Sequence, residues 1–182
     1  MKIGIDIDNT LCDTNLIAEK IYAKQYKDMY LSDLDKKSQY NFIGTNADKI
    51  FDNCPLKKDA KRVINDLSKD NEIYFISARA NRHVPLLEEK TVEYLKLHKI
   101  KYTDIYFGHD SKIDMFKKLN LDIMLDDDYD VYEEITNDNL KAIMFDGLIH
   151  ILHNSFLYSY IRKKLVALAK LIRTKNFCLN RF

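Results

Sequence analysis

Hydrophobic residues gather in five short runs along the chain, each rich in Ile, Phe, Tyr, Leu or Met. Short and nearly continuous apolar runs are typical of strands that helices cover on both faces, as in a parallel sheet. The predicted strands are Lys2–Ile7, Ile73–Ser77, Asp104–Phe107, Asp122–Leu125 and Ala142–Phe145.

Helical spacing separates these strands, because apolar side chains recur there three or four positions apart. The predicted helices are Lys57–Ser68, Leu86–His98 and Ser111–Leu119. Strands that alternate with helices predict right-handed βαβ crossovers. We therefore expect an α/β fold built on a Rossmann-like, doubly wound parallel sheet.

The connection between the first two strands is much longer than the others. About 65 residues separate Ile7 from Ile73, far more than a crossover needs. Residues 14–54 are therefore expected to form a small helical cap inserted after the first strand. Helices are predicted there at Asn15–Met29 and Asn46–Asn53.

The C-terminal segment has a different character. Apolar residues recur at helical spacing from Phe156 to Ile172, which predicts an amphipathic helix. Residues 151–182 hold seven Lys or Arg and no Asp or Glu, so the remaining residues carry a net charge of −6. Three interpretations stay open for residues 156–173: packing against the rest of the chain, a homodimer interface, or contact with an anionic membrane surface.

The length of 182 residues fits one compact domain with a modest insertion. The expected organisation is a core formed by 1–13 and 55–147, the cap 14–54, and the basic C-terminal helix within 148–182.

Composition narrows the class of protein. Apolar residues make up 46% and charged residues 31%, and a net charge of +1 gives no reason to expect a nucleic acid polymer as partner. Cys12, Cys54 and Cys178 form no metal-binding or disulfide pattern and are expected to be reduced thiols. Because Asp6 follows soon after the start and no run of about 18 apolar residues occurs, we expect neither a signal peptide nor a membrane-spanning helix. A cytoplasmic protein is the resulting prediction.

Polar residues cluster where the predicted strands end. The first strand leads into Asp6 and Asp8. The carboxyl ends of parallel strands meet at one edge of a sheet, where ligands bind in open α/β folds. We therefore expect these side chains to lie close to the polar residues that follow the other strands. Those segments are Ser77-Ala78-Arg79, Gly108-His109-Asp110-Ser111-Lys112 and Asp126-Asp127-Asp128.

Together these side chains suit phosphate chemistry. The Asp residues after the first and fourth strands supply hard oxygen ligands, which Mg²⁺ prefers. Without a cation, several carboxylates packed together would have raised pKa values and would destabilise the fold. Lys112 and Ser77 then add a positive charge and a hydroxyl donor for phosphoryl oxygens, which is most of what phosphoryl transfer requires.

These motifs resemble those of the haloacid dehalogenase-like hydrolase superfamily. Its first motif, DxDx[TV] after the first strand, is matched by Asp6-Ile7-Asp8-Asn9-Thr10. Ser77 matches the second motif, Lys112 the third, and Asp126-Asp127 the paired acidic fourth. The resemblance covers roughly residues 1–146, and four motifs in the right order are far more specific than one.

The resemblance implies a role for each residue. Asp6 would attack phosphorus to form an aspartyl-phosphate, and Asp8 would protonate the leaving oxygen and then deprotonate a water. Mg²⁺ would be held by Asp6, the backbone carbonyl of Asp8, and Asp126 or Asp127, with Asp127 favoured as the direct ligand. Substrate contacts are expected from Thr10, Ser77, Ala78 and Arg79, with Lys112 completing the catalytic set.

Within the superfamily the chain is most similar to small nucleotidases related to the cytosolic 5′(3′)-deoxyribonucleotidases. The segments that carry this likeness are Ile76–Arg79, Gly108–Lys112 and Leu125–Asp130. Two positions depart from that group, since Asn9 replaces a usual Gly and Asp128 a usual Arg. Asn tolerates left-handed backbone, so we expect the loop to form all the same.

The likeness implies hydrolysis of a small phosphorylated metabolite, with a nucleoside monophosphate as the leading substrate. Three alternatives stay open: a sugar-phosphate phosphatase of surface polysaccharide synthesis, a phosphotransferase or phosphonatase on the same scaffold, and a non-catalytic binding protein recruited through the C-terminal helix. Tyr40 and Phe42 in the cap either stack on a substrate or form the cap's own core. Lys117 and Lys118 are rivals of Lys112 for the phosphate-binding role.

Overall fold

The structure is a computed structural model that describes residues 1–27 and 29–145. They belong to a compact unit, Met1–Phe145. The helix expected at 156–173 lies outside the described residues, so its three interpretations stay predictions.

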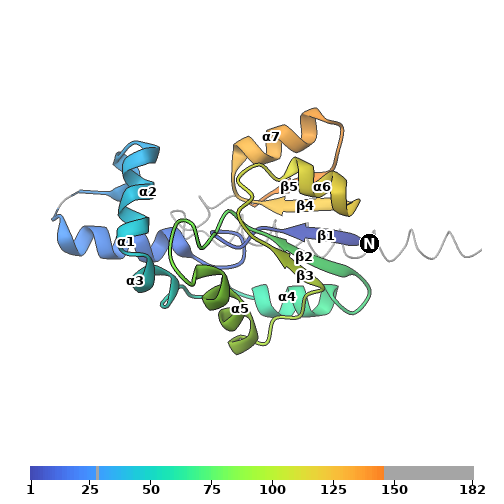
Figure 1. Ribbon diagram of the computed structural model, residues 1–182, viewed down its shortest axis with the longest axis horizontal. Coiled ribbons are helices and arrows are strands. Elements are labelled where there is room, and N and C mark those ends of the chain that lie inside the picture. The colour runs from blue at the N-terminus through green and yellow to red at the C-terminus, as the bar shows by residue number, and fades with distance from the viewer. Residues whose placement is uncertain (28, 146–182) are drawn as a thin grey trace, which may run out of the picture. The chain divides into compact units, whose positions relative to one another are not determined.

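A five-stranded parallel sheet forms the centre of this unit, in the order β3-β2-β1-β4-β5 (Figure 1). The strands are β1 (Lys2–Ile5), β2 (Glu72–Ile76), β3 (Asp104–Tyr106), β4 (Ile123–Asp126) and β5 (Ala142–Met144). All five predicted strands are confirmed, each to within two residues at its ends. The predicted α/β, Rossmann-like fold class is thereby confirmed.

Helices cover both faces of the sheet, with α4 (Ala60–Leu67) and α5 (Leu87–Leu97) on one side and α6 (Ile113–Leu119) and α7 (Tyr129–Asn137) on the other (Figure 1). The sequence patterns predict α4, α5 and α6 but miss α7. Only Val131 and Ile135 are buried in α7, and one such pair is too short a pattern to recognise. A helix-start signal was nevertheless present, because the Asp128 side chain accepts a hydrogen bond from the backbone N–H of Asp130.

The face under α6 and α7 is filled by a cluster of buried apolar side chains. Its members are Tyr74, Ile76, Met115, Phe116, Leu121, Met124, Val131 and Ile135. Gly4 makes room for this cluster from the central strand, since a Cβ there would lie 2.6 Å from Met124 Sδ and 2.7 Å from Leu121 Cδ1.

The long insertion is helical, as predicted. It contains α1 (Thr14–Gln25), the 3₁₀ turn η1 (Leu31–Asp33), α2 (Lys36–Thr45) and α3 (Ala47–Phe51). These elements surround their own small apolar cluster of Ala18, Tyr22, Leu31 and Ile50. Helix α1 ends at Gln25, four residues before the predicted end, and α2 was not predicted at all. Because α2 buries no residue completely, hydrophobic spacing could not reveal it, although its N-cap Asp35 was a recognisable start signal.

Two aromatic residues of α2 have different surroundings. Phe42 packs edge-on against Tyr22 with ring centroids 5.0 Å apart, which favours its interpretation as part of the apolar cluster of the inserted helices. Tyr40 is 66% exposed and remains available to a ligand.

The two ends of the insertion lie side by side. Cys12 and Leu56 form an isolated antiparallel bridge, and the backbone N–H of Asp13 donates to the carbonyl of Pro55. The ammonium of Lys57 lies 2.6 Å from Asp13 Oδ1, and both side chains are buried. A buried ion pair therefore connects the start of the insertion to its end. No pattern in the sequence predicted this contact.

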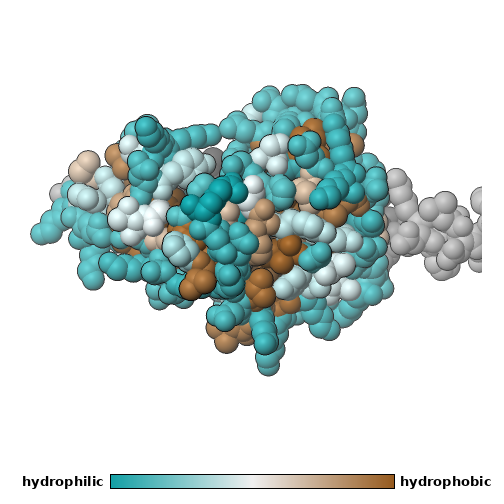
Figure 2. Space-filling model, in the orientation of Figure 1, coloured by the Kyte–Doolittle hydropathy of each residue, from teal (hydrophilic) through white to brown (hydrophobic). Residues whose placement is uncertain are grey.

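The surface seen in Figure 2 is mostly hydrophilic, with small hydrophobic patches between the polar areas. Among the helices of the described residues, none is long and apolar enough to cross a membrane.

Candidate functional site

The site lies at the carboxyl ends of β1 and β4, the neighbouring strands at the centre of the sheet. The register pairs Ile5 with Leu125, and the N–H of Asp6 donates to the carbonyl of Leu125 at 2.9 Å. Asp6 and Asp126 are therefore held side by side at this edge. The chain leaves β1 toward β2 and β4 toward β5, in opposite directions, so this is the topological switch point at which doubly wound sheets bind ligands.

Lys112 connects the two carboxylates. Its ammonium lies 2.5 Å from Asp6 Oδ1 and 2.7 Å from Asp126 Oδ2, and all three side chains are at most 7% exposed. Lys112 immediately precedes α6, and the loop before it brings the residue back over the strand ends. The sequence offered three candidates for the phosphate-binding Lys, namely Lys112, Lys117 and Lys118. The structure places Lys112 beside the carboxylates, whereas Lys117 pairs with Asp138 at the surface.

Asp127 completes a group of three carboxylates. One oxygen each from Asp6, Asp126 and Asp127 lies within 4.8 Å of the others, which is close enough to hold one metal ion. Thr10 donates a hydrogen bond of 3.1 Å to Asp127 Oδ1. Asp8 was expected to bind the metal through its backbone carbonyl. Its side chain does not join this group of carboxylates.

The electrostatics of these carboxylates favour the binding of a cation. Burial raises the pKa of Asp6 well above its usual range; Lys112 opposes this effect in part, and Asp126 adds to it. Burial, together with the neighbouring Asp126, raises the pKa of Asp127 to about 7. Carboxyl groups that resist ionisation in this way gain most from a cation placed between them.

Asp8 faces Arg79 instead. Arg79 Nε donates to Asp8 Oδ2 at 2.9 Å and Nη2 donates to Asp8 Oδ1 at 2.7 Å, while Thr14 Oγ1 donates to Oδ1 at 2.5 Å. Burial by itself would raise the pKa of Asp8. The charge and hydrogen bonds of Arg79, with that of Thr14, outweigh burial and lower the pKa below its ordinary value.

The loop after β2 carries Ser77 and Arg79 to the same edge. Ser77 is fully buried, and its Oγ accepts the backbone N–H of Arg79 at 3.2 Å. The loop after β3 lies against it, because the N–H of His109 donates to the Ser77 carbonyl and that of Gly108 to the Arg79 carbonyl. Ala78, which stands between Ser77 and Arg79 in the chain, is half-buried.

The loop after β1 has the expected backbone. Asn9 has a φ of 57°, so the residue that replaces the usual Gly does adopt the left-handed conformation. Its side-chain oxygen also accepts the backbone N–H of Asn15 at the start of α1. The first motif is thereby joined to the inserted helices.

Three residues that contact this site were not singled out from the sequence. Thr14 bonds to Asp8, Thr91 Oγ1 accepts from Arg79 Nη1, and the ring of Phe51 lies 4.5 Å from the Arg79 guanidinium carbon. None belongs to a motif. Thr91 and Phe51 lie in helices far along the chain from Arg79, and Thr14, although only six residues from Asp8, opens a helix that the first motif does not include. Only the tertiary structure could identify them.

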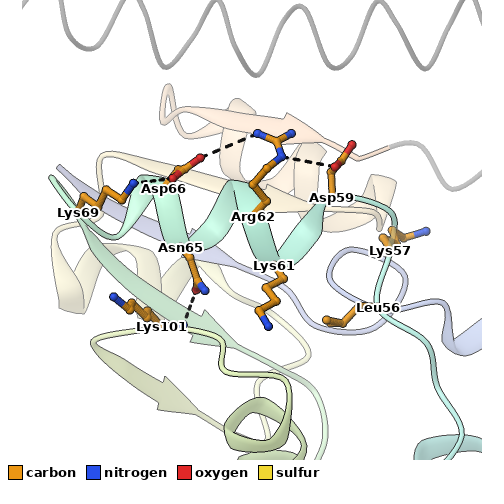
Figure 3. Close-up of a pocket in the computed structure, with 9 residues that line it drawn as sticks. All are labelled: Leu56, Lys57, Asp59, Lys61, Arg62, Asn65, Asp66, Lys69 and Lys101. Carbon is orange, nitrogen blue, oxygen red and sulfur yellow. Dashed lines mark hydrogen bonds and ion pairs between the residues drawn. The ribbon is translucent and has the colours of Figure 1, made fainter.

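A separate cavity of about 560 Å³ lies along α4 (Figure 3). Its wall includes the surface ion pairs of Arg62 with Asp59 and of Lys69 with Asp66. The lining residues are Leu56, Lys57, Asp59, Lys61, Arg62, Asn65, Asp66, Lys69 and Lys101. None of the four motifs contributes to it, so it is not part of the carboxylate site.

Comparison with known proteins agrees with this geometry. The family model for haloacid dehalogenase-like hydrolases matches residues 3–105, more than half of the chain. The chain belongs to this family and is a hydrolase of the haloacid dehalogenase-like type.

Individual relatives point the same way. A protein of Clostridium acetobutylicum named as a nucleotidase is 29% identical over 159 residues, which cover 80% of each chain. Among solved structures, a haloacid dehalogenase-like family hydrolase from Streptococcus pneumoniae is similar in fold, with a TM-score of 0.52 and 13% identity over 79% of this chain and 83% of the other. A HAD-superfamily hydrolase from Geobacter sulfurreducens has a TM-score of 0.55 and 6% identity over 79% of this chain and 86% of the other. At such identities these structures support the fold alone.

Proposed function

We propose that the protein is a Mg²⁺-dependent phosphomonoester hydrolase that forms an aspartyl-phosphate on Asp6. The observation that carries the proposal is the grouping of the buried Asp6 and Asp126 and the half-buried Asp127 with the ammonium of Lys112 at the carboxyl edge of β1 and β4. Few other reactions need a carboxylate nucleophile, further carboxylates and a fixed cation in one place.

The residues fit Mg²⁺ as the cofactor. The three carboxylates offer only oxygen ligands, which is the donor type that Mg²⁺ prefers, and the raised pKa values of Asp6 and Asp127 favour a nearby cation. The backbone carbonyl of Asp8 is a further candidate ligand. When bound, Mg²⁺ would neutralise negative charge on the phosphoryl group and on the Asp side chains.

The protein's own residues divide the chemistry between two carboxylates. An oxygen of Asp6 attacks phosphorus while the bond from phosphorus to the leaving oxygen breaks, and Asp8 gives that oxygen a proton. Asp8 then takes a proton from the water that cleaves the aspartyl-phosphate, which regenerates both residues. Lys112 and the Ser77 hydroxyl would bind the non-bridging phosphoryl oxygens.

A nucleoside monophosphate is the proposed substrate. The proposal draws on the similarity to the Clostridium protein named as a nucleotidase. Tyr40 supports it, because an exposed aromatic ring gives a base a stacking partner. It lies one helical turn after Lys36, which contacts Asp130 of α7 at 3.1 Å, near the Asp126–Asp128 segment.

Phosphate release from a panel of nucleoside monophosphates and sugar phosphates tests the proposal. We expect release in the presence of Mg²⁺, loss of release with EDTA, and loss of at least about 10³-fold in the Asp6→Asn protein. Asp110→Asn is the matched control, since Asp110 is a largely exposed carboxylate that follows another strand. If wild type releases phosphate from no member of the panel, or if Asp6→Asn remains active, the proposed mechanism is wrong.

A further inference from the structure

The first turn of α7 lies directly beside the carboxylate site. Strand β4 ends at Asp126 and α7 begins at Tyr129. The backbone N–H of Asp128 donates to Asp126 Oδ1 at 3.0 Å, which folds the short connection back onto the site. Because consecutive Cα atoms are about 3.8 Å apart, the Cα atoms of Asp127 and Tyr129 lie within about 7.6 Å of each other. The helix therefore presents its first residues next to the carboxylates.

The inserted helices reach the same place. The ammonium of Lys36, in the first turn of α2, lies 3.1 Å from Asp130 Oδ2, and both side chains are exposed. The hydrogen bond and the charge of Asp130 raise the pKa of Lys36, and Asp128 and Tyr40 add to this effect. These side chains are therefore near one another, and α2 approaches the start of α7 beside the site.

Exposed aromatic rings are found on both of these helices. Four Tyr side chains are exposed in the part of the chain that the structure describes, and two of them follow α1. The other two are Tyr40 of α2, at 66% exposure, and Tyr129 of α7, at 56%. They belong to the two helices that the Lys36–Asp130 contact connects. Aromatic rings exposed beside a polar site provide the stacking surface that a nucleic acid base requires.

The ring of Tyr129 is supported from behind. It packs against Tyr132, one turn further along α7, with ring centroids 6.2 Å apart and an angle of 36° between the planes. Tyr132 is half-buried, whereas more than half of Tyr129 faces solvent. Because this contact already restricts the ring, stacking of a base on its exposed part would cost little further side-chain entropy.

We propose that Tyr129 is a specificity-determining residue that stacks on the base of a nucleoside monophosphate bound at the carboxylate site. The inference rests on the proposed function, and it places part of the base-binding surface on α7 as well as on the inserted helices. The ribose separates the base from the phosphate, so the base reaches a ring that lies beside the phosphate site. A sugar phosphate has no base and gains nothing from this contact.

Steady-state kinetics of Tyr129→Ala with two substrates test this role. Loss of a stacking contact should raise KM for a nucleoside monophosphate at least about fivefold and leave KM for ribose 5-phosphate unchanged within about twofold. Tyr129→Phe keeps the ring and should retain the wild-type KM for both substrates. Tyr26→Ala is the matched control, because Tyr26 is 48% exposed, also packs against another Tyr ring, and lies at the far end of α1 from the first motif.

A binding measurement gives a second readout that does not depend on turnover. The sequence contains no Trp, so Tyr129→Trp introduces a single indole whose fluorescence can be followed. In the Asp6→Asn background with Mg²⁺, a nucleoside monophosphate should quench this fluorescence, whereas ribose 5-phosphate should not. Neither ligand should change the fluorescence of the matching Tyr26→Trp protein.

Three results would overturn the inference. They are an unchanged KM for the nucleotide in Tyr129→Ala, an equal rise in KM for both substrates, and an indole that the nucleotide does not quench. None of them affects the proposed function as long as wild type releases phosphate and Asp6→Asn does not. A wild type that hydrolyses no substrate, with an indole that the nucleotide alone quenches, would instead defeat the hydrolase mechanism and keep the base contact.

Discussion

The ammonium of Lys112 lies 2.5 Å from the carboxylate of Asp6, a residue 106 positions earlier in the chain. Both side chains are almost fully buried. Burial alone would lower the pKa of Lys112, but the charges of Asp6 and Asp126 outweigh burial and raise the pKa above its usual value. Lys112 therefore stays protonated at every pH at which the protein would work, and it is a fixed positive charge beside the proposed nucleophile.

Replacing Lys112 by Met should damage both stability and activity. Removing one partner of a buried ion pair leaves the other uncompensated, which typically costs about 3–5 kcal/mol. Urea unfolding of the metal-free protein measures this loss, and phosphate release should fall at least about 10²-fold. Lys117→Met in the adjoining helix α6 serves as control, because its ion pair with Asp138 is exposed and should contribute less than about 1 kcal/mol. Equal effects of the two substitutions would contradict the central role of Lys112.

Mg²⁺ binding should depend on pH through Asp127. Its carboxyl group has a pKa of about 7 in the metal-free protein, so it must lose a proton before it can bind the ion. Affinity should rise as pH increases toward about 7 and Asp127 ionises, with a proton released from Asp127 on binding below that value. Titration calorimetry in buffers of different ionisation enthalpy measures both quantities. Proton release that does not change between about pH 5.5 and 8.5 would argue against this assignment.

The same group should make the metal-free protein less stable as pH rises. Because the folded-state pKa lies above the ordinary 3.8, the folded protein holds more protons than the unfolded chain between about pH 4 and 7. The contribution of Asp127 is thus favourable at the acidic end of this window and is lost toward its upper end. Thermal unfolding without metal should show this decline, and Asp127→Asn should reduce it.

Tyr40→Ala should weaken the binding of nucleoside monophosphates and leave the binding of a sugar phosphate unchanged. Stacking of a base on an aromatic ring is worth about 1–3 kcal/mol, which corresponds to a rise in KM of roughly 5- to 150-fold for a nucleoside monophosphate. Ribose 5-phosphate has no base, so its KM should not change. Tyr30→Ala is the control, because Tyr30 is equally exposed at 63%. If both KM values rise together, Tyr40 does not act through the base.

Gly4→Ala tests the packing of the central strand. The new Cβ would meet Met124 Sδ at 2.6 Å and Leu121 Cδ1 at 2.7 Å, and overpacking of this kind costs about 1–3 kcal/mol. Gly44→Ala provides a contrast, since nothing lies within 4 Å of its Cβ and the residue is in the last turn of α2. There the substitution should stabilise by up to about 1 kcal/mol. Chemical denaturation of both proteins measures the difference in sign.

Local patterns in the sequence were enough for the framework. Each strand is a short apolar run whose neighbours in the chain are helical. Because helices cover both faces of the sheet, nearly every residue of a strand is apolar, and such a run can be recognised from the sequence alone. The motif residues Asp6, Ser77, Lys112 and Asp126 could be found for a related reason. Each ends a strand, directly follows one or precedes the next helix, and parallel strands bring such positions to one edge.

Other features depended on the tertiary structure. Helix α2 buries no residue completely and α7 buries only Val131 and Ile135, so hydrophobic spacing carried too little information to predict either. The contact of Arg79 with Asp8 spans 71 positions, and the sequence alone favoured Arg79 as a substrate contact. The sequence shows that an Arg carries a positive charge, but the tertiary structure determines which group it pairs with. Here burial decides, because a guanidinium out of water must pair with the carboxylate within its reach.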